Sequence, residues 1–525
     1  MADGYLAFVL HAHLPFIRHP EYEYFLEERW FFEAMTETYL PLLEVFENLR
    51  ADGARFPLTL SLSPSLLAMM EDPLLQARYR RHLGGLIALT DHEQERLRDE
   101  GHMAWLAGWY GDFFRRMAAL YDRWDGRVSQ AFRALHETGD IELMTCTATH
   151  GLLPLLAARP KTVEAQVRTG LDWFERVMGF RPRGLWLPEC AWTPGLDGVL
   201  RREGIRYFFL ESHGIENASA APLAGVHAPL YTPEGVAAFG RDRESLQEVW
   251  SADEGFPGDG DYREFYRDVG HDLPWDYVGP FIGGDVRSDT GIKYHRITGP
   301  TPHKALYDPH AARDKAALHA GEFVDKRVAQ LHHLRTLLEA PVVVAPFDAE
   351  LYGHWWFEGP QWLDFVLRKL AFDQDVVALT TVSGYLDRHP VQQTATPGTS
   401  SWGHRGTFEI WLNESNDWIH DHLTECARRL EELAAAQAEP VDALTDRALR
   451  QAVRELLLAQ ASDWPFIIAN GTATEYAERR VRDHVARFHH LADGVARGTI
   501  DGDALGVLEA MDNPFPDADW RVFAP

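Results

Sequence analysis

Two short apolar segments of the chain each lead directly into a carboxylate that is flanked by tryptophan. Val342 to Ala345 precede Asp348, and Gly184 to Leu187 precede Glu189. Cleavage of a glycosidic bond with retention needs one carboxylate as nucleophile and a second as acid and then base, about 5–5.5 Å apart. The two segments therefore predict the catalytic acids of a glycoside-processing enzyme.

A single acid after a strand is more often a helix cap or a surface charge than a catalytic group. Two such acids with the same tryptophan-rich surroundings make that reading weaker. Pro188 restricts the residue before it to extended geometry, which helps to fix Glu189 where a strand ends. Cys190 beside it could suggest a thiol nucleophile, but a small buried apolar side chain is the usual role of a free cysteine.

Histidines follow several of the predicted strands. His11 and His13 are two residues apart on an extended segment, so both side chains point to one face. They could donate hydrogen bonds to sugar hydroxyls or to a catalytic carboxylate, they could be core histidines, or they could bind a metal, although zinc normally needs a third protein ligand. Of these roles we favour hydrogen-bond donation. His150 and His354 are similar cases, and His354 is placed to tune Asp348.

Tryptophans are the second group of candidate binding residues. The chain has 17 of them, and pyranose rings stack on indole faces, although large cores also use tryptophan. Trp402 stands in a glycine-rich turn where packing explains it poorly, so we predict that it stacks on sugar. The remaining candidates are Trp275, Trp355, Trp411 and Trp464.

The elements that must position these residues are short β-type runs that alternate with helical segments. Such an alternation predicts an α/β fold whose functional residues gather at the carboxyl ends of parallel strands, as at the top of a barrel. The predicted strands are Tyr5 to Leu10, Pro57 to Leu62, Ile141 to Thr145, Gly184 to Leu187, Tyr207 to Leu210 and Val342 to Ala345.

Composition shifts divide the chain further. Residues from about 74 to 138 show helical spacing and predict a helical insertion, and residues from about 212 to 290 predict an irregular loop region over the active site. The polar, turn-forming stretch near 392–401 indicates a domain boundary. We therefore expect a catalytic domain over 1–395 and a helical domain over 396–525 that contributes to the substrate cleft.

The bulk composition excludes several classes of function. Lys and Arg number 51 against 79 Asp and Glu, and a net charge of −28 repels phosphate backbones and anionic lipid, so no nucleic acid and no membrane partner is expected. No window approaches the roughly 18 apolar residues of a membrane span. The acidic N-terminus predicts no export signal, and three cysteines fit a reducing compartment, so the predicted location is cytoplasmic.

At these residues the chain resembles glycoside hydrolase family 57, and within it the 1,4-α-glucan branching enzymes. The resemblance spans nearly the whole chain and rests on several ordered motifs of high specificity. They are His11-Ala-His-Leu-Pro15, Gly139-Asp-Ile-Glu-Leu-Met-Thr145 with Ala148-Thr-His150, Trp186-Leu-Pro-Glu189, Phe347-Asp-Ala-Glu-Leu-Tyr-Gly-His-Trp-Trp356 and Ala461-Ser-Asp-Trp-Pro-Phe466.

The resemblance implies an incomplete (β/α)7 barrel with helical insertions followed by an all-α C-terminal domain, a retaining mechanism, and no metal or other cofactor. By motif, Glu189 matches the nucleophile and Asp348 the general acid/base. The substrate-binding set that it implies, together with the residues above, is His11, His13, His150, Trp275, His354, Trp355, Trp402, Trp411, Asp463, Trp464 and Tyr231.

One segment departs from the family pattern. Branching enzymes of this type are expected to carry a loop with a tyrosine that covers the covalent intermediate and helps to exclude water. The corresponding stretch, Gly214 to Thr232, is short, and Tyr231 is its only tyrosine. With an incomplete lid, water would compete with the glucan acceptor.

The leading hypothesis is an α-glucan branching enzyme that acts on an α-1,4-glucan polymer, as a monomer. A hydrolase or a 4-α-glucanotransferase of the same family would share the glycosyl-enzyme and differ only in the acceptor. A metal-dependent polysaccharide deacetylase that recruits His11 and His13, and a non-catalytic glucan-binding protein, are alternatives from other classes.

Overall fold

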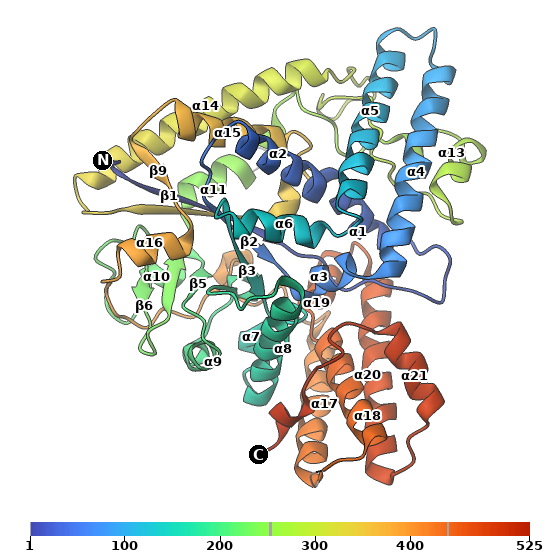
Figure 1. Cartoon of the computed structure of the whole chain (residues 1–525), viewed down its shortest axis with the longest axis vertical. Helices are drawn as coiled ribbons and strands as arrows, with labels where there is room; N and C mark the ends of the chain where they lie inside the picture. The colour runs from blue at the N-terminus through green and yellow to red at the C-terminus, as the bar shows by residue number, and fades with distance from the viewer. Residues whose placement is uncertain (1, 251–254, 438–439) are drawn as a thin grey trace.

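The central feature of the fold is a parallel sheet built around the N-terminal strand. A computed structural model describes residues 2–250, 255–437 and 440–525. In it β1 (Gly4–Ala12) pairs with β2 (Leu58–Leu62) on one side and β8 (Val342–Asp348) on the other. With β3 (Ile141–Cys146) and β4 (Leu185–Trp186) the order is β4-β3-β2-β1-β8 (Figure 1).

A second group of strands continues the wall. β5 (Tyr207–Leu210) pairs in parallel with β7 (Ala237–Gly240), and the short β6 (Leu230–Tyr231) pairs antiparallel with β7. A parallel bridge from Gly184 to Tyr207 joins this group to β4, and Asp242 N–H donates to the Val344 carbonyl of β8. The strands therefore form an incomplete barrel, and this prediction is confirmed.

The strands form where the sequence is apolar because they are buried on both faces. Every residue of β2 and β3 is buried, as is all of β8 except its last residue. Parallel strands that are covered on both sides have such continuous apolar sequences. The β1–β8 register sets His11 opposite Asp348, so a histidine and an acid reach the same edge of the sheet.

Three of the described strands, β6, β7 and β9 (Val377–Leu379), were not predicted from the sequence. β7 and its neighbour β6 lie inside the stretch that was predicted to be irregular, and so do α11 (Arg243–Trp250), α12 (Val269–Asp272) and α13 (Trp275–Ile282). β7 reads Ala-Ala-Phe-Gly, which has little intrinsic β preference, so its pairing with β5 decides its conformation. Residues 251–254 of the predicted loop region lie outside the described residues.

Two helical parts stand out from the barrel in Figure 1. The stretch predicted to be a helical insertion contains α4 (Pro73–Arg96), α5 (His102–Arg123) and α6 (Val128–Glu137), of which α4 and α5 pack together as a hairpin. The C-terminal part is all helical, as predicted. It contains α17 (Asp417–Ala436), α18 (Ala443–Ala459), α19 (Asp463–Asn470), α20 (Thr474–Arg497) and α21 (Gly502–Met511).

The remaining helices cover the barrel or connect its strands. They are α1 (Glu28–Ala34), α2 (Leu40–Ala51), α3 (Pro64–Met70), α7 (Leu153–Leu156), α8 (Pro160–Met178), α9 (Leu196–Arg202), α10 (Ser212–Glu216), α14 (Pro309–Arg335), α15 (Gly359–Phe372) and α16 (Val382–Arg388), with β9 (Val377–Leu379) against the start of β1. A π-helical turn, η1 (Met35–Tyr39), joins α1 to α2.

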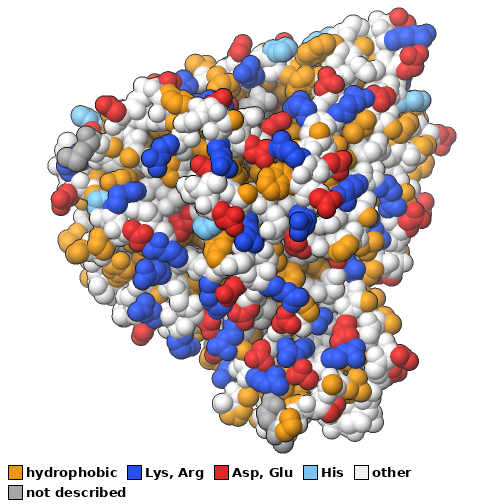
Figure 2. Space-filling model, viewed as in Figure 1, with side chains coloured by type: hydrophobic (Ala, Val, Ile, Leu, Met, Phe, Trp, Pro, Cys, Tyr) orange, Lys and Arg blue, Asp and Glu red, His pale blue; other side chains and the backbone are white. Residues whose placement is uncertain are grey.

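Acidic and basic side chains are interspersed over the face in Figure 2, in spite of the net charge of −28. Among the described residues, none of the helices combines the length and the apolar character that a membrane crossing requires.

Candidate active site

Glu189 lies just past the end of β4 in an unusual backbone conformation. It forms part of a short 3-10 turn, Pro188–Cys190, and both Glu189 (φ 61°) and Cys190 (φ 49°) adopt left-handed values. Two consecutive non-glycine residues with positive φ are strained, and such strain gathers at functional sites. The turn is held by the backbone of Trp402, whose N–H donates to the Glu189 carbonyl at 2.9 Å.

The carboxylate of Glu189 accepts two hydrogen bonds from distant parts of the chain. Trp402 Nε1 donates to Oε2 at 2.6 Å, and the Ser462 hydroxyl donates to Oε1 at 2.8 Å. Burial raises the pKa of Glu189 to about 7, and the charges of Asp463 and Asp348 add to the rise, while the two donors lower it. These donors stabilise the ionised form, which is the form that a nucleophile needs.

Asp348 ends β8 and lines the same cleft as Glu189, a cavity of about 540 Å³. Burial raises the pKa of Asp348 to about 7, with the Glu350 charge as the next cause, and Arg241 and His13 lower it. Within the described residues no side chain or backbone group hydrogen-bonds to its carboxylate. In the described part of the chain Asp348 therefore lacks the hydrogen-bond donors that stabilise an ionised carboxylate, whereas Glu189 accepts two of them.

The turn after Asp348 packs tightly against the π-helical turn η1. Gly353 has φ +118°, and a Cβ at this position would lie 1.7 Å from the Glu37 carbonyl oxygen. In this contact Glu350 accepts hydrogen bonds from the Tyr39 hydroxyl and from the His13 backbone N–H. The fit fixes a second acid next to Asp348, which accounts for its effect on the Asp348 pKa.

The predicted histidines His11, His13 and His150 form one cluster beside Glu189. The ring of His150 stacks on that of His13 with centroids 3.9 Å apart, and its Nε2 lies 3.1 Å from His11 Nε2. His150 Nδ1 lies 2.8 Å from the Ser462 hydroxyl. The histidines therefore support the group that holds Glu189.

The three rings differ in their protonation. Burial, with the positive charge of His13, lowers the pKa values of His11 and His150, so both are neutral. Burial also opposes protonation of His13, but Asp463, whose carboxylate lies 3.1 Å from His13 Nε2, raises its pKa overall. Of the three histidines, His13 is therefore the one whose surroundings favour the protonated form, and a positive charge on it lowers the Asp348 pKa.

Two sets of side chains near Glu189 have the spacing of metal ligands. The ligand atoms of His13, His150 and Asp463, and those of His11, Cys146 and His150, lie within 4.8 Å of one another. The ring nitrogens already face partners, namely Ser61 and His150 for His11, Ser63 and Asp463 for His13, and Ser462 and His11 for His150. Burial raises the pKa of the Cys146 thiol, which opposes the thiolate form that binds metal. A metal would have to displace these hydrogen bonds.

Two of the predicted tryptophans reach the cleft. Trp402 and Trp411 both line it, with Trp411 almost fully buried beneath Gly403. The guanidinium of Arg241 lies 4.8 Å from the centroid of the Trp402 ring. Since its Nε1 donates to Glu189 and Arg241 lies over its ring, Trp402 positions the carboxylate in addition to any contact with sugar.

Other predicted binding residues lie elsewhere. Trp464 is 0% exposed and donates to the Leu458 carbonyl, so it is a core residue. Trp275 lies on α13, which packs against α4, and Trp355 is 57% exposed and stacks on Phe265. None of the three lines the cleft with Glu189 and Asp348.

The prediction that His354 tunes Asp348 is not supported. Its Nδ1 lies 3.4 Å from Glu37, and Glu37 and Glu33 raise the His354 pKa against the opposing effect of burial. The cation that lowers the Asp348 pKa most is instead Arg241.

The segment that corresponds to the family's lid, residues 214–232, does not line the cleft. Tyr231 pairs with Ala237 at the start of β7, whereas Arg241 follows the end of that strand. His227 accepts a hydrogen bond from Val342, at the start of β8. Residues 219–231 therefore run toward the opposite end of the barrel, and among the described residues none of 214–232 lines the cleft.

Several residues of the site were not predicted from the sequence. Arg241 follows β7 and pairs with Glu211 at 2.8 Å. Because β7 was not predicted, the sequence did not mark Arg241 as a residue at the end of a strand. Ser462 lies beside Asp463 in a motif that was noted, but nothing local marks it as a partner of Glu189. Trp250 and Phe466 also line the cleft.

Comparison with known proteins adds independent information. A model described as "Glycosyl hydrolase family 57" matches residues 7–397, and one described as "1,4-alpha-glucan branching enzyme, C-terminal" matches residues 422–523. The chain is 34% identical to a 1,4-alpha-glucan branching enzyme of Thermococcus kodakarensis, over 98% of this chain and 77% of that protein.

Solved structures of the same kind resemble the whole molecule. The alpha-amylase AmyC of Thermotoga maritima superposes with a TM-score of 0.93 at 42% identity, covering 99% of both chains. A GH57-type branching enzyme of Pyrococcus horikoshii superposes with a TM-score of 0.90 at 32% identity, covering 100% of this chain and 97% of that one.

Proposed function

The chain belongs to glycosyl hydrolase family 57, and from this membership we propose that it is a 1,4-alpha-glucan branching enzyme. The observation that carries the proposal is the cleft in which Glu189, held by Trp402 and Ser462, faces the same cavity as Asp348. The match of the C-terminal helices to the branching-enzyme model supports branching in particular, because Ser462 and Asp463 belong to that part of the chain.

In the first step ionised Glu189 attacks the anomeric carbon of an α-1,4-linked glucose. Asp348 gives its proton to the departing 4-oxygen, so the glycosidic bond breaks as the ester to Glu189 forms. The donors Trp402 Nε1 and Ser462 Oγ hold the Glu189 oxygens in place, and the raised pKa of Asp348 keeps its proton available near neutral pH.

In the second step the same groups act in reverse. Asp348 removes the proton from the 6-hydroxyl of a glucan acceptor, and the resulting oxygen attacks the anomeric carbon and releases Glu189. Two inversions give net retention, so the product is an α-1,6 branch. His13, whose pKa is raised by Asp463, is held beside the site by Ser63 and Asp463.

Hydrolysis is a second candidate outcome of the same intermediate. The 42% identity to a protein described as an alpha-amylase supports hydrolysis. The position of residues 214–232 supports it too, because none of these described residues lines the cleft. Water would then take the place of the 6-hydroxyl. Location in the cytoplasm and a monomeric state stay predictions.

Incubation with amylose, followed by enzymatic debranching and chain-length profiling, tests the proposal. We expect new short chains that appear only after debranching. An increase in reducing ends with no new α-1,6 linkages would reject branching in favour of hydrolysis, and longer linear chains alone would indicate 4-α-glucan transfer. Full activity after exhaustive chelation would dismiss the metal-dependent deacetylase.

A further inference from the structure

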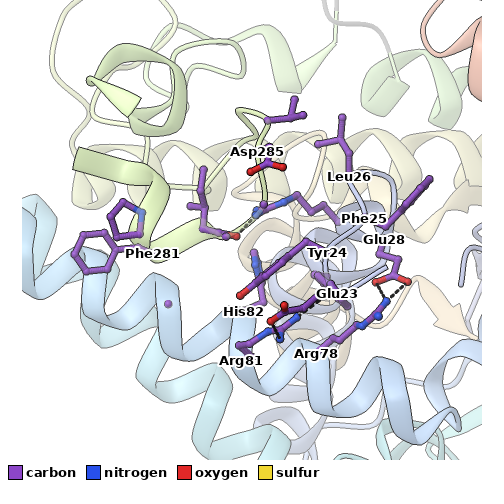
Figure 3. Close-up of a pocket in the computed structure, with 18 residues that line it drawn as sticks. Glu23, Tyr24, Phe25, Leu26, Glu28, Arg78, Arg81, His82, Phe281 and Asp285 are labelled. Carbon is purple, nitrogen blue, oxygen red and sulfur yellow. Dashed lines mark hydrogen bonds and ion pairs between the residues drawn. The ribbon is translucent and has the colours of Figure 1, made fainter. Parts of the chain in front are cut away.

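A cavity of about 430 Å³ lies away from the active site, between α4, residues 23–29 that lead into α1, and residues 280–286 at and after the end of α13 (Figure 3). Among the described residues, none of those that line it also lines the cleft of Glu189. Its volume is in the range of small-ligand sites.

The aromatic wall of the cavity is fixed in position. Tyr24 is 43% exposed, and the Arg81 guanidinium lies 4.2 Å from its ring centroid. Gly283 has φ +71°, and a Cβ there would lie 2.2 Å from the Tyr24 ring, so this close approach requires glycine. Figure 3 shows Tyr24 beside His82, with Phe281 further along the same cavity.

A buried polar group in the cavity lacks a partner. Arg29 is 8% exposed, one of its terminal nitrogens donates to the Ile282 carbonyl, and Nη1 makes no hydrogen bond within the described chain. A buried donor without an acceptor is costly, and a ligand oxygen would satisfy it. This group points to a ligand independently of the shape of the cavity.

The charges of the lining indicate the class of ligand. Burial, with the nearby Arg29 charge, lowers the pKa of His82 to about 3, so this ring is neutral. The charged residues of the lining balance, with three arginines against three acids. Two pairs of these are already joined, Arg78 with Glu28 and Arg81 with Glu23. Neither an anion nor a cation gains a net attraction. A neutral ligand with many hydroxyls meets both donors and acceptors beside an aromatic ring. The six charged residues are Arg29, Arg78, Arg81, Glu23, Glu28 and Asp285.

We propose that this cavity is a second carbohydrate site that anchors an α-glucan chain outside the catalytic cleft. The ligand class rests on the proposed function. The site lies at one end of the helical run α1–η1, whose other end carries Tyr39, the donor to Glu350 next to Asp348. From Arg29 to Tyr39 this run spans on the order of 15 Å at about 1.5 Å per residue. A long chain held at the cavity would be kept close to the active site.

The test uses the full chain with Glu189→Gln, so that no turnover occurs, and maltoheptaose as the probe in calorimetric titration. We expect two sites per chain. Tyr24→Ala in this background should remove one of them or weaken it by about threefold to tenfold. Tyr24→Phe, which keeps the ring, should keep the site. Trp402→Ala in the same background should weaken the other site and leave the Tyr24-dependent one intact.

The matched control is Trp105→Ala, which removes an aromatic side chain of similar exposure, 42%, from α5. It should leave both sites unchanged. In the active enzyme, Tyr24→Ala should raise KM for amylose by a similar factor and leave kcat/KM for maltotetraose unchanged. A thermal melt of each variant separates loss of binding from loss of folding.

The failures can be distinguished. If only a Trp402-dependent site binds maltoheptaose, the second site does not exist, while the proposed function stands. If neither site binds, the proposed function fails as well. If inorganic phosphate binds in a Tyr24-dependent manner and maltoheptaose does not, Arg29 recruits an anion and the carbohydrate assignment is overturned.

Discussion

The hydroxyl of Ser462 donates to Glu189 Oε1 across 2.8 Å, and so joins the start of the C-terminal helices to the end of a barrel strand. The same hydroxyl meets His150 Nδ1 at 2.8 Å. Because one of the two side-chain donors to the proposed nucleophile comes from the C-terminal part, the two parts of the chain complete one site together.

Removal of this donor should impair chemistry more than binding. Ser462→Ala removes one of the two side-chain donors that the described part of the chain supplies to Glu189, so the ionised form of Glu189 becomes less stable. A hydrogen bond to a charged group is worth about 1.5–3 kcal/mol, so kcat should fall about tenfold to a hundredfold. KM for amylose should change little. Ser415→Ala, which removes an exposed serine in the preceding segment, is the control. A large rise in KM with unchanged kcat would contradict the assigned role.

The roles of the two acids can be separated by the stereochemistry of rescue. In Glu189→Gly, azide should enter the space left by the carboxylate and attack an activated α-maltooligosyl fluoride directly, giving the inverted azide. In Asp348→Ala, azide should attack the ester to Glu189 and give the retained azide. Nuclear magnetic resonance of the products decides. The opposite pairing of variants and products would exchange the two roles.

Asp348→Asn should stabilise the folded protein at neutral and alkaline pH. The folded pKa of Asp348 is about 7 against an ordinary value of 3.8, so the folded state binds more protons than the unfolded state between these values. The contribution of Asp348 to the free energy of unfolding is therefore fully present below about pH 3.8 and is lost as the pH rises to about 7. Asparagine does not titrate and avoids the loss.

The expected gain in Tm for Asp348→Asn is roughly 1–3 °C at pH 8 and smaller at pH 5, measured by calorimetry. The control, Asp314→Asn, changes an exposed acid on α14. A gain that is equal at both pH values would mean that the effect comes from packing and not from the buried charge.

Arg241 should set the alkaline limit of activity. Catalysis needs Asp348 protonated, and Arg241 lowers the Asp348 pKa. In Arg241→Ala that pKa should rise, so the alkaline limb of kcat/KM against pH should move upward by about half a unit to one unit. The maximum rate should also fall, because Trp402 loses the guanidinium over its ring.

The control for Arg241 is Arg243→Ala, two residues further on, where an exposed guanidinium pairs with Glu216. Its pH profile should match that of the unchanged protein. If the alkaline limb of Arg241→Ala stays in place while activity falls, Arg241 acts only through packing.

Much of the barrel could be predicted because local sequence is sufficient for buried parallel strands. Tyr207 to Leu210 was predicted with its bounds, and the run before Asp348 with one end in error. β7 could not be predicted in this way, since the short sequence Ala-Ala-Phe-Gly becomes a strand only when β5 supplies the hydrogen-bonding edge. Tyr231, a predicted substrate-binding residue, lies outside the cleft for a related reason, because a loop's direction depends on the strand that it joins.

Residue types and their spacing by themselves determined which side chains could perform chemistry, because a strand that ends in an acid can be recognised from a few consecutive residues. Tertiary structure alone decided which of them meet. Glu189 depends on Trp402 and Ser462, 213 and 273 residues away, and Trp464, two positions after Ser462, turns into the core. Periodicity reports only the local face of an element, whereas such contacts are fixed by the packing of the whole chain.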